Sequence, residues 1–286
     1  MQELARAKIN LSLRVLGRRP DGYHELESLV VFADAADRLS IEPARTLSLS
    51  LSGPFAGQLE TGPENLVLRA ARALQDYAGI GCGASIALEK NLPVASGIGG
   101  GSSDAAGTLR ALCKLWHLQI TQSDLAQLAL GLGADVPVCL SQTPALMRGV
   151  GEKIVAVENL PPLPMLLVNP GVAVSTAEIF RLLNASPMKN EATPTASAPG
   201  FSGMENLVQW LERNLNDLEK PAIALAPSIA EALQALRALA GCLHARMSGS
   251  GATCFGLFLD AGKAREAAGA LRQSHPGWWV ALSGCD

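Results

Sequence analysis

Alternating apolar and polar residues predict a β-strand near the start of the chain. In residues 7–15 the two kinds of residue alternate strictly. The apolar positions are Ile9, Leu11, Leu13 and Val15, and the polar positions are Lys8, Asn10, Ser12 and Arg14. The pattern predicts a half-buried strand whose polar face carries Lys8 and Asn10 side by side, where both can address one ligand. A lysine on the solvated face of an edge strand is the ordinary alternative.

The rest of the first half predicts short strands and amphipathic helices. Residues 17–26 form a turn-rich segment between two strands, and further strands are expected at 29–32, 39–41, 47–51 and 84–88. Helices are expected over 65–77, from Ser102 to about Trp116, and from a capping-box-like start at Thr121 to near residue 131. Two strands are expected within 147–157, and a proline-rich linker follows at 160–164.

The second half predicts a different order of elements. Strands are expected at 165–169, 243–248, 253–259 and 278–282, and helices after Ser175 and at 204–213, 227–240 and 262–273. This order is typical of a split βαβ, ferredoxin-like sandwich with an insertion. Residues 185–203 contain few bulky apolar side chains and predict a mobile surface loop. We therefore expect an α+β protein with two domains, residues 1–158 and 159–286.

Composition excludes several classes of protein. The 286 residues are 48% hydrophobic, enough for two cores, and the formal net charge of −3 argues against a nucleic-acid partner. The N-terminus lacks a signal-peptide pattern and no segment approaches the length of a membrane span, so we expect a cytoplasmic protein that does not bind membranes. The scattered cysteines, without metal-ligand spacing, predict reduced thiols: Cys82, Cys113, Cys139, Cys242, Cys254 and Cys285.

A glycine-rich stretch, PVASGIGGGSSDAA at residues 93–106, is the first candidate for chemistry. Its glycines allow positive φ and close backbone approach, and Ser102 is expected to open a helix whose N-terminus attracts anions. Taken alone, such a stretch is equally typical of a simple connector. It lacks the lysine of a P-loop, and residues 121–130, where a dinucleotide fold would place a second strand that ends in an acidic residue, read as helix. The stretch therefore predicts some other nucleotide-binding architecture.

A second candidate is Asp135, in a turn bounded by Gly133 and Pro137. A carboxylate among apolar neighbours in such a turn is poorly solvated. On spacing alone, a turn-capping aspartate is more typical than a catalytic base.

Seven strings, taken together and in order, resemble one family. They lie between Ala7 and Phe258 and read AKINLSL, GRRPDGYHEL, EKNLPVASGIGGGSSDAA, GADVP, NPG, NDLE and MSGSGA. The glycine-rich stretch and the Gly-Ser-Gly turn are similar to motifs of the GHMP kinases, which phosphorylate small alcohols. The N-terminal strings are similar to a narrower group, the 4-diphosphocytidyl-2-C-methyl-D-erythritol kinases of the non-mevalonate isoprenoid pathway.

The resemblance implies a two-domain GHMP kinase fold: an N-terminal ribosomal-protein-S5-domain-2-like α/β domain and a C-terminal ferredoxin-like domain. It implies ATP as cosubstrate, Mg²⁺ with it, and a cytidine diphosphate-linked methylerythritol whose 2-hydroxyl is phosphorylated. It places catalysis at Lys8 and Asp135. The implied nucleotide contacts are Pro93, Gly97, Gly99, Gly100, Gly101, Ser102, Ser103 and Asp104. The implied substrate contacts are Asn10, Tyr23, His24, Lys90, Asp135, Phe180, Gly249, Ser250 and Gly251.

The sequence departs from the family at one place. Val30 and Val31 stand where relatives are expected to carry an aromatic residue, which leaves open the residue that sandwiches the cytosine opposite Tyr23. Two alternative functions also stay open at this point: a kinase for another small alcohol, such as homoserine or mevalonate, and a non-catalytic nucleotide-binding module.

Overall fold

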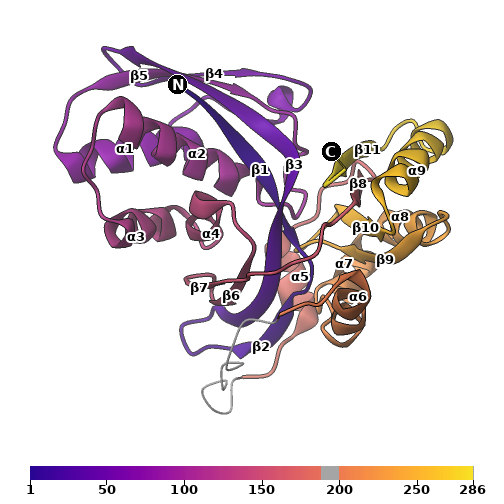
Figure 1. Cartoon of the computed structure of the whole chain (residues 1–286). Coiled ribbons are helices and arrows are strands. Elements are labelled where there is room, and N and C mark those ends of the chain that lie inside the picture. The colour runs from indigo at the N-terminus through magenta and orange to yellow at the C-terminus, as the bar shows by residue number, and fades with distance from the viewer. Residues whose placement is uncertain (188–199, 286) are drawn as a thin grey trace. The chain divides into compact units, whose positions relative to one another are not determined.

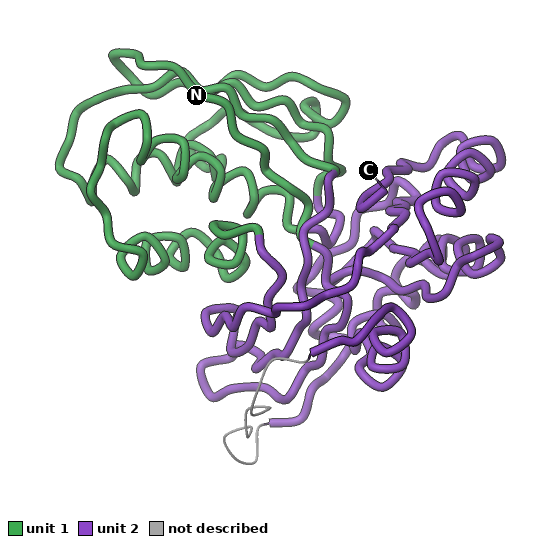
Figure 2. The backbone as a smooth tube through the Cα atoms, viewed as in Figure 1, with its two compact units in different colours: residues 1–8, 35–94, 99–142 green, residues 9–34, 95–98, 143–286 purple. Residues whose placement is uncertain are grey.

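The computed structural model describes residues 1–187 and 200–285 (Figure 1). The chain forms two compact units, each built from separate segments (Figure 2). Unit 1 contains Met1–Lys8, Ala35–Val94 and Gly99–Gln142, and unit 2 contains Ile9–Asp34, Ala95–Ile98 and Thr143–Asp286. Most of the loop predicted at 185–203 lies outside the described residues. Within the described part of the chain, no helix has the length and apolar character needed to cross a membrane.

Unit 1 contains a sheet with helices along one face (Figure 1). Its strands are β4 (Ser48–Ser52), β5 (Gly83–Glu89) and parts of β1 (Gln2–Asn10) and β3 (His24–Ala44), which both continue into unit 2. β5 pairs parallel with β4 and antiparallel with the C-terminal part of β3, while β1 also pairs with β3. A short 3-10 turn, Ala56–Gln58, follows β4.

The helices of unit 1 begin and end largely where local chemistry predicts. They are α1 (Leu66–Ala78), α2 (Gly100–Leu115), α3 (Gln122–Leu132) and α4 (Val136–Ser141). The side chains of Asn65 and Thr121 cap α1 and α3, and Gly79 ends α1 in a left-handed conformation. The predicted start of α2 at Ser102 is wrong by two residues, because Gly99 is already the N-cap residue. The short helix α4 was not predicted.

Unit 2 contains the N-terminal part of β3 and the second sheet of the protein. That part of β3 pairs antiparallel with β2 (Arg14–Arg18) and β6 (Ala145–Gly149), and β6 pairs with β7 (Lys153–Ala156). The second sheet has the antiparallel order β11-β8-β10-β9. Its strands are β8 (Met165–Asn169), β9 (Cys242–Met247), β10 (Cys254–Phe258) and β11 (Trp279–Ser283). This is the order of a ferredoxin-like split βαβ unit, as predicted.

The helices of unit 2 are α5 (Thr176–Leu183), α6 (Met204–Arg213), α7 (Glu219–Leu225), α8 (Ser228–Arg237) and α9 (Ala261–Ser274). Of these, α8 and α9 pack against the second sheet. Ile229 and Leu233 of α8 and Leu271 of α9 are buried in one cluster with Leu166 and Val168 of β8. Ser175 caps α5 as predicted, whereas α7 was not predicted.

Two strand predictions are wrong in extent. The alternating segment 7–15 is not one half-buried strand: β1 ends at Asn10, and Lys8, Asn10 and Ser12 are all buried, because both faces of this segment are covered. The strands expected at 29–32 and 39–41 are parts of the single 21-residue strand β3. The polar residues between them do not end the strand, because the Asp37 carboxylate accepts hydrogen bonds from the Asn91 and Leu92 amides.

Candidate active site

The glycine-rich stretch contains the N-terminus of α2, which begins at Gly100. Gly97 and Gly99 have φ values of +74° and +63°, and the chain passes from unit 2 to unit 1 between Ile98 and Gly99. No side-chain hydrogen bond caps α2, so the amides of its first turn and the positive end of its dipole suit an anionic ligand. In unit 1, Gly99 lies against Lys8, because a Cβ added at this glycine would be 3.2 Å from the Lys8 Cβ.

Lys8 and Asp135 form an ion pair within unit 1. The Lys8 Nζ lies 2.7 Å from Asp135 Oδ2, and the exposed fractions of the two side chains are 4% and 36%. Asp135 occupies the N-cap position of α4 but its carboxylate makes no capping hydrogen bond, so the turn-capping alternative does not describe it. The pair therefore places a buried ammonium group and an accessible carboxylate next to the start of α2.

The serine pair of α2 is divided between the interior and the accessible side of the helix. Ser103 is buried, its hydroxyl donates to the Arg6 carbonyl at 2.6 Å, and it lies 3.3 Å from the Cys139 sulfur. Burial raises the pKa of the Cys139 thiol to about 12, so this cysteine is not a nucleophile at neutral pH. Ser102 is only partly buried, so it is the serine whose hydroxyl is better placed to meet a ligand.

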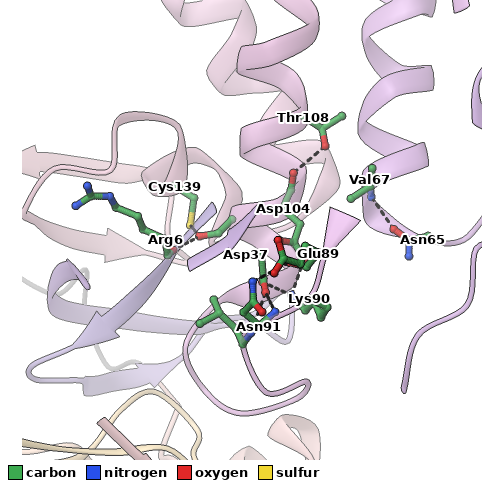
Figure 3. A network of polar contacts seen from close by, with 12 residues as sticks. Arg6, Asp37, Asn65, Val67, Glu89, Lys90, Asn91, Asp104, Thr108 and Cys139 are labelled. Carbon is green, nitrogen blue, oxygen red and sulfur yellow. Dashed lines mark hydrogen bonds and ion pairs between the residues drawn. The ribbon is translucent and has the colours of Figure 1, made fainter. Parts of the chain in front are cut away.

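Lys90 lies in a buried ionic cluster beneath the first turn of α2 (Figure 3). Its Nζ is 2.5 Å from Asp37 Oδ2 and 2.6 Å from Asp104 Oδ2, and a Cβ added at Gly100 would be 3.1 Å from the same nitrogen. Burial raises the pKa of Asp104 to about 7, with the Asp37 charge adding to the rise and the Lys90 charge opposing it. The carboxylates already engage Lys90, and this geometry favours a supporting role for Lys90 and Asp104 over direct ligand contact.

Apart from Lys90, which is in unit 1, the residues predicted to bind the cytidyl group lie in unit 2. The rings of His24 and Phe180 stack with centroids 4.6 Å apart and an interplanar angle of 23°, while Tyr23 is 64% exposed. Burial, followed by the nearby Arg18 charge, lowers the pKa of His24. A neutral imidazole both donates and accepts hydrogen bonds, which suits the edge of a base. The hydroxyls of Ser250 and Thr176 are 2.8 Å apart in the same unit.

Asn10, Gly97 and the turn at residues 249–251 meet inside unit 2. Asn10 is buried; its side-chain NH₂ donates to Ser28 Oγ at 2.7 Å, while its Oδ1 has no partner among the described residues. A Cβ added at Gly249 would be 2.6 Å from the Gly97 carbonyl oxygen and 3.2 Å from Asn10 Oδ1. Only glycine fits so tight an approach. A buried amide oxygen without a protein partner is suited to accept a hydrogen bond from a ligand.

Three residues of these surroundings were not predicted from the sequence. The sequence does contain a signal for Asp37, which shares the buried face of β3 with Leu39 and Ile41. A carboxylate that is buried on such a face needs a polar partner. Asn216 lies in the NDLE string, for which no role was assigned. Ser248 lies in the MSGSGA string, in which only residues 249–251 are predicted substrate contacts.

Comparison with known proteins shows the family of the chain. The model of the GHMP kinases N terminal domain matches residues 65–143, and that of the GHMP kinases C terminal matches residues 199–277. A 4-diphosphocytidyl-2-C-methyl-D-erythritol kinase from Parvibaculum lavamentivorans is 55% identical over 282 residues, covering 98% of this chain and 97% of the relative. One from Cereibacter sphaeroides is 54% identical over 280 residues, with the same coverage.

Solved structures extend the comparison to the fold. A crystal structure of 4-(cytidine 5'-diphospho)-2C-methyl-D-erythritol kinase matches with a TM-score of 0.77 and 40% identity, covering 99% of this chain and 98% of the other. A homoserine kinase from Cytophaga hutchinsonii matches with a TM-score of 0.73 at 20% identity, over 99% of this chain and 94% of the other, and shares the fold alone. With full-length identities above half, this chain belongs to the family of 4-diphosphocytidyl-2-C-methyl-D-erythritol kinases, within the GHMP kinases.

Proposed function

We propose that this protein transfers the γ-phosphoryl group of ATP to the 2-hydroxyl of 4-diphosphocytidyl-2-C-methyl-D-erythritol. The observation that carries the proposal is the Lys8–Asp135 ion pair beside Gly99 at the N-terminus of α2. A hydroxyl acceptor needs a base and a positive charge close to a phosphate site, and unit 1 supplies all three. The names of the relatives identify the acceptor alcohol.

In the proposed phosphoryl transfer, Asp135, Lys8 and the first turn of α2 each have a separate role. As the hydroxyl oxygen bonds to the γ-phosphorus, the bond to the bridging oxygen breaks, and ADP leaves with that electron pair. Asp135 accepts the hydroxyl proton, a role that contributes roughly 10²- to 10⁴-fold to rate. The Lys8 ammonium stabilises the charge on the transferring group, and the amides at the start of α2 hold the phosphates.

We propose that Mg²⁺ arrives with ATP. Within residues 1–187 and 200–285 no group of three or more His, Cys, Asp or Glu side chains is arranged to hold a metal ion. Magnesium sites in kinases are usually completed by substrate phosphates and water, with one or two protein oxygens. Ser102 fits such a site better than Ser103, whose hydroxyl already donates to Arg6. When bound, the ion neutralises charge on the ATP phosphates.

Recognition of the cytidyl group is assigned to unit 2. The stacked His24 and Phe180 rings supply aromatic faces, and the exposed Tyr23 ring supplies a further face for the base. The lowered pKa of His24 keeps its imidazole neutral at pH 7, ready to donate to and accept from the cytosine edge. Because the partners are ATP and a small nucleotide-linked alcohol, we also propose a cytoplasmic location and no nucleic-acid partner.

A substrate comparison tests the function directly. The purified protein is incubated with Mg²⁺-ATP and, in separate reactions, the cytidyl substrate, homoserine or mevalonate. ADP release is followed by a coupled assay, and the new phosphate monoester by phosphorus NMR. We expect turnover with the cytidyl substrate and none with homoserine or mevalonate. No turnover with it, or a comparable kcat/KM with homoserine or mevalonate, would contradict the proposal.

A further inference from the structure

The side-chain NH₂ group of Asn216 donates both of its hydrogen bonds to the main chain around the turn at residues 249–251. It is buried in unit 2, and its Nδ2 donates to the carbonyl oxygens of Met247 and Gly249, both at 2.8 Å. Its Oδ1 accepts from the Leu218 amide at 3.0 Å. The two donated bonds reach both sides of Ser248, so they fix the path of the chain as it enters the turn.

The segment that carries Asn216 is itself anchored. The Leu13 amide donates to the Leu215 carbonyl at 3.0 Å, and the Asp217 amide donates to the Leu13 carbonyl at 2.8 Å. The Asp217 carboxylate accepts from the Val15 amide at 2.7 Å, and Glu219 Oε2 accepts from the Met247 amide at 3.0 Å. Each polar side chain of the NDLE string therefore binds main chain, and Asn216 is the one directed at the turn.

The Ser248 hydroxyl connects the turn to two residues of the candidate site. Its buried hydroxyl donates to the Gly97 carbonyl at 3.0 Å and accepts from the Asn10 amide at 3.0 Å. A main-chain hydrogen bond also restrains the turn, because the Gly251 amide donates to the Ser248 carbonyl at 2.9 Å. A shift of Ser248 would therefore move Gly97 and Asn10 together.

We infer that Asn216 is a positioning residue of the kinase, which acts through Ser248 to hold Gly97 and Asn10 in place for ATP and the acceptor alcohol. The inference rests on the proposed function. Asn216 acts on main-chain groups of the turn, and the two residues that it places are the predicted nucleotide contact Gly97 and the predicted substrate contact Asn10. Misplacement of reacting groups by about 1 Å can lower a rate roughly 10²-fold.

A double-mutant cycle in the full-length protein tests the inference. Asn216→Ala is expected to lower kcat/KM for both substrates by roughly 10- to 100-fold, and Ser248→Ala by a similar factor. In Asn216→Ala/Ser248→Ala the loss should be far smaller than the product of the two single losses, because both variants break one chain of contacts. Independent, multiplying effects would overturn the inference.

The matched control is Asn214→Ala, which removes one side-chain hydrogen bond to the Trp210 carbonyl in the same unit. Its kcat/KM should stay within about twofold of the wild-type value even where its Tm falls as far as that of Asn216→Ala. Equal kinetic losses in the two variants would mean that Asn216 acts through stability alone, and would overturn the inference. If Asn216→Ala does not accumulate as folded protein, Asn216→Ser, which keeps one donor, takes its place with an intermediate loss.

Hydrogen exchange separates this inference from the proposed function. The amides of residues 248–253 in the ligand-free protein should exchange faster in Asn216→Ala than in wild type or Asn214→Ala, and this measurement does not depend on which alcohol the enzyme phosphorylates. Unchanged exchange would overturn the positioning role. If the wild-type protein phosphorylates no cytidyl substrate, yet Asn216→Ala shows this change in exchange, the result would count against the proposed function while leaving the contact between Asn216 and the turn in place.

Discussion

The proposed role of Asp135 depends on its environment, because its side chain is 36% exposed while that of its partner Lys8 is buried. The carboxylate makes no capping hydrogen bond on α4 and pairs with Lys8 at 2.7 Å. Asp135→Asn keeps the size of the side chain but removes its ability to accept a proton. We expect kcat to fall by roughly 10²-fold or more with little change in ATP affinity, measured by a coupled ADP assay and by calorimetry.

The control for this variant is Asp76→Asn, at an exposed position on α1 in the same unit, which should keep wild-type kinetics. A kcat near the wild-type value in Asp135→Asn would show that the proton goes elsewhere.

The titration of Asp104 should make the stability of the protein depend on pH. Burial raises its pKa from an ordinary value of 3.8 to about 7, so the folded protein binds this proton more tightly than the unfolded chain. The contribution of this group to stability should therefore fall as the pH rises from about 4 to about 7 and level off above. Asp104→Asn removes the titration and should flatten this part of the curve of Tm against pH. Parallel curves for variant and wild type would refute the assignment, and Asp76→Asn again serves as the control.

Single residues differ in how far the sequence alone predicts them. Lys8 and Asp135 were predicted because they match family strings, but their contact joins a strand to a helix that begins more than 100 positions later, which no local pattern shows. The interior position of Lys90 was not predicted, since a lysine at the end of a strand is usually solvated. Its burial depends on Asp37 and Asp104, which come from two other elements.

At the level of elements, local chemistry predicts helix ends well and strand lengths poorly. Asn65, Thr121 and Ser175 cap their helices through bonds to amides two or three residues away, a range that the sequence shows directly. The 21 residues of β3 were divided in the prediction, because the partner of Asp37 lies more than 50 residues away. The helices α4 and α7, of six and seven residues, are too short to show a clear period.

The start of α2 depends on the left-handed conformation of Gly99. At a φ of +63°, with a Cβ position 3.2 Å from the Lys8 Cβ, an alanine is strained and crowded. Gly99→Ala is expected to lower the free energy of unfolding by about 1 kcal/mol or more and to weaken ATP binding, because the first turn of α2 must shift. Urea unfolding and calorimetry measure the two effects.

Gly131→Ala, in α3 of the same unit, is the matched control. Nothing lies within 4 Å of its Cβ position, so this alanine should be neutral or stabilise the protein by up to about 1 kcal/mol. An unchanged ATP affinity in Gly99→Ala would argue against α2 as the phosphate site.

At the level of the whole molecule, the compact units do not coincide with a division of the chain at one boundary. The predicted boundary near residue 158 falls between the two family matches at 65–143 and 199–277. The compact unit that holds the second sheet also takes in residues 9–34 and 95–98. No hydrophobic pattern predicts that residues 9–34 and 95–98 belong to this unit, since this depends on the distant surfaces that they cover. The domains 1–158 and 159–286 stay a prediction about folding, and this prediction can be tested.

We expect the isolated fragment 159–286 to be less stable than the same region of the intact chain. Leu13 is buried in the core cluster of unit 2 with Ile229 and Leu233, and the Leu11 carbonyl accepts from the buried Arg246 guanidinium at 3.2 Å. Loss of one buried leucine side chain alone destabilises a protein by about 2–5 kcal/mol. Without residues 9–34, the midpoint of urea unfolding should fall, and the amides of residues 214–218 and β9 should exchange faster. Adding the fragment 1–158 should reverse both effects, because it returns Leu13 and the main-chain bonds of Leu11 to the cluster. A fragment that unfolds alone at the midpoint of the intact chain would show that residue 158 bounds an independent domain.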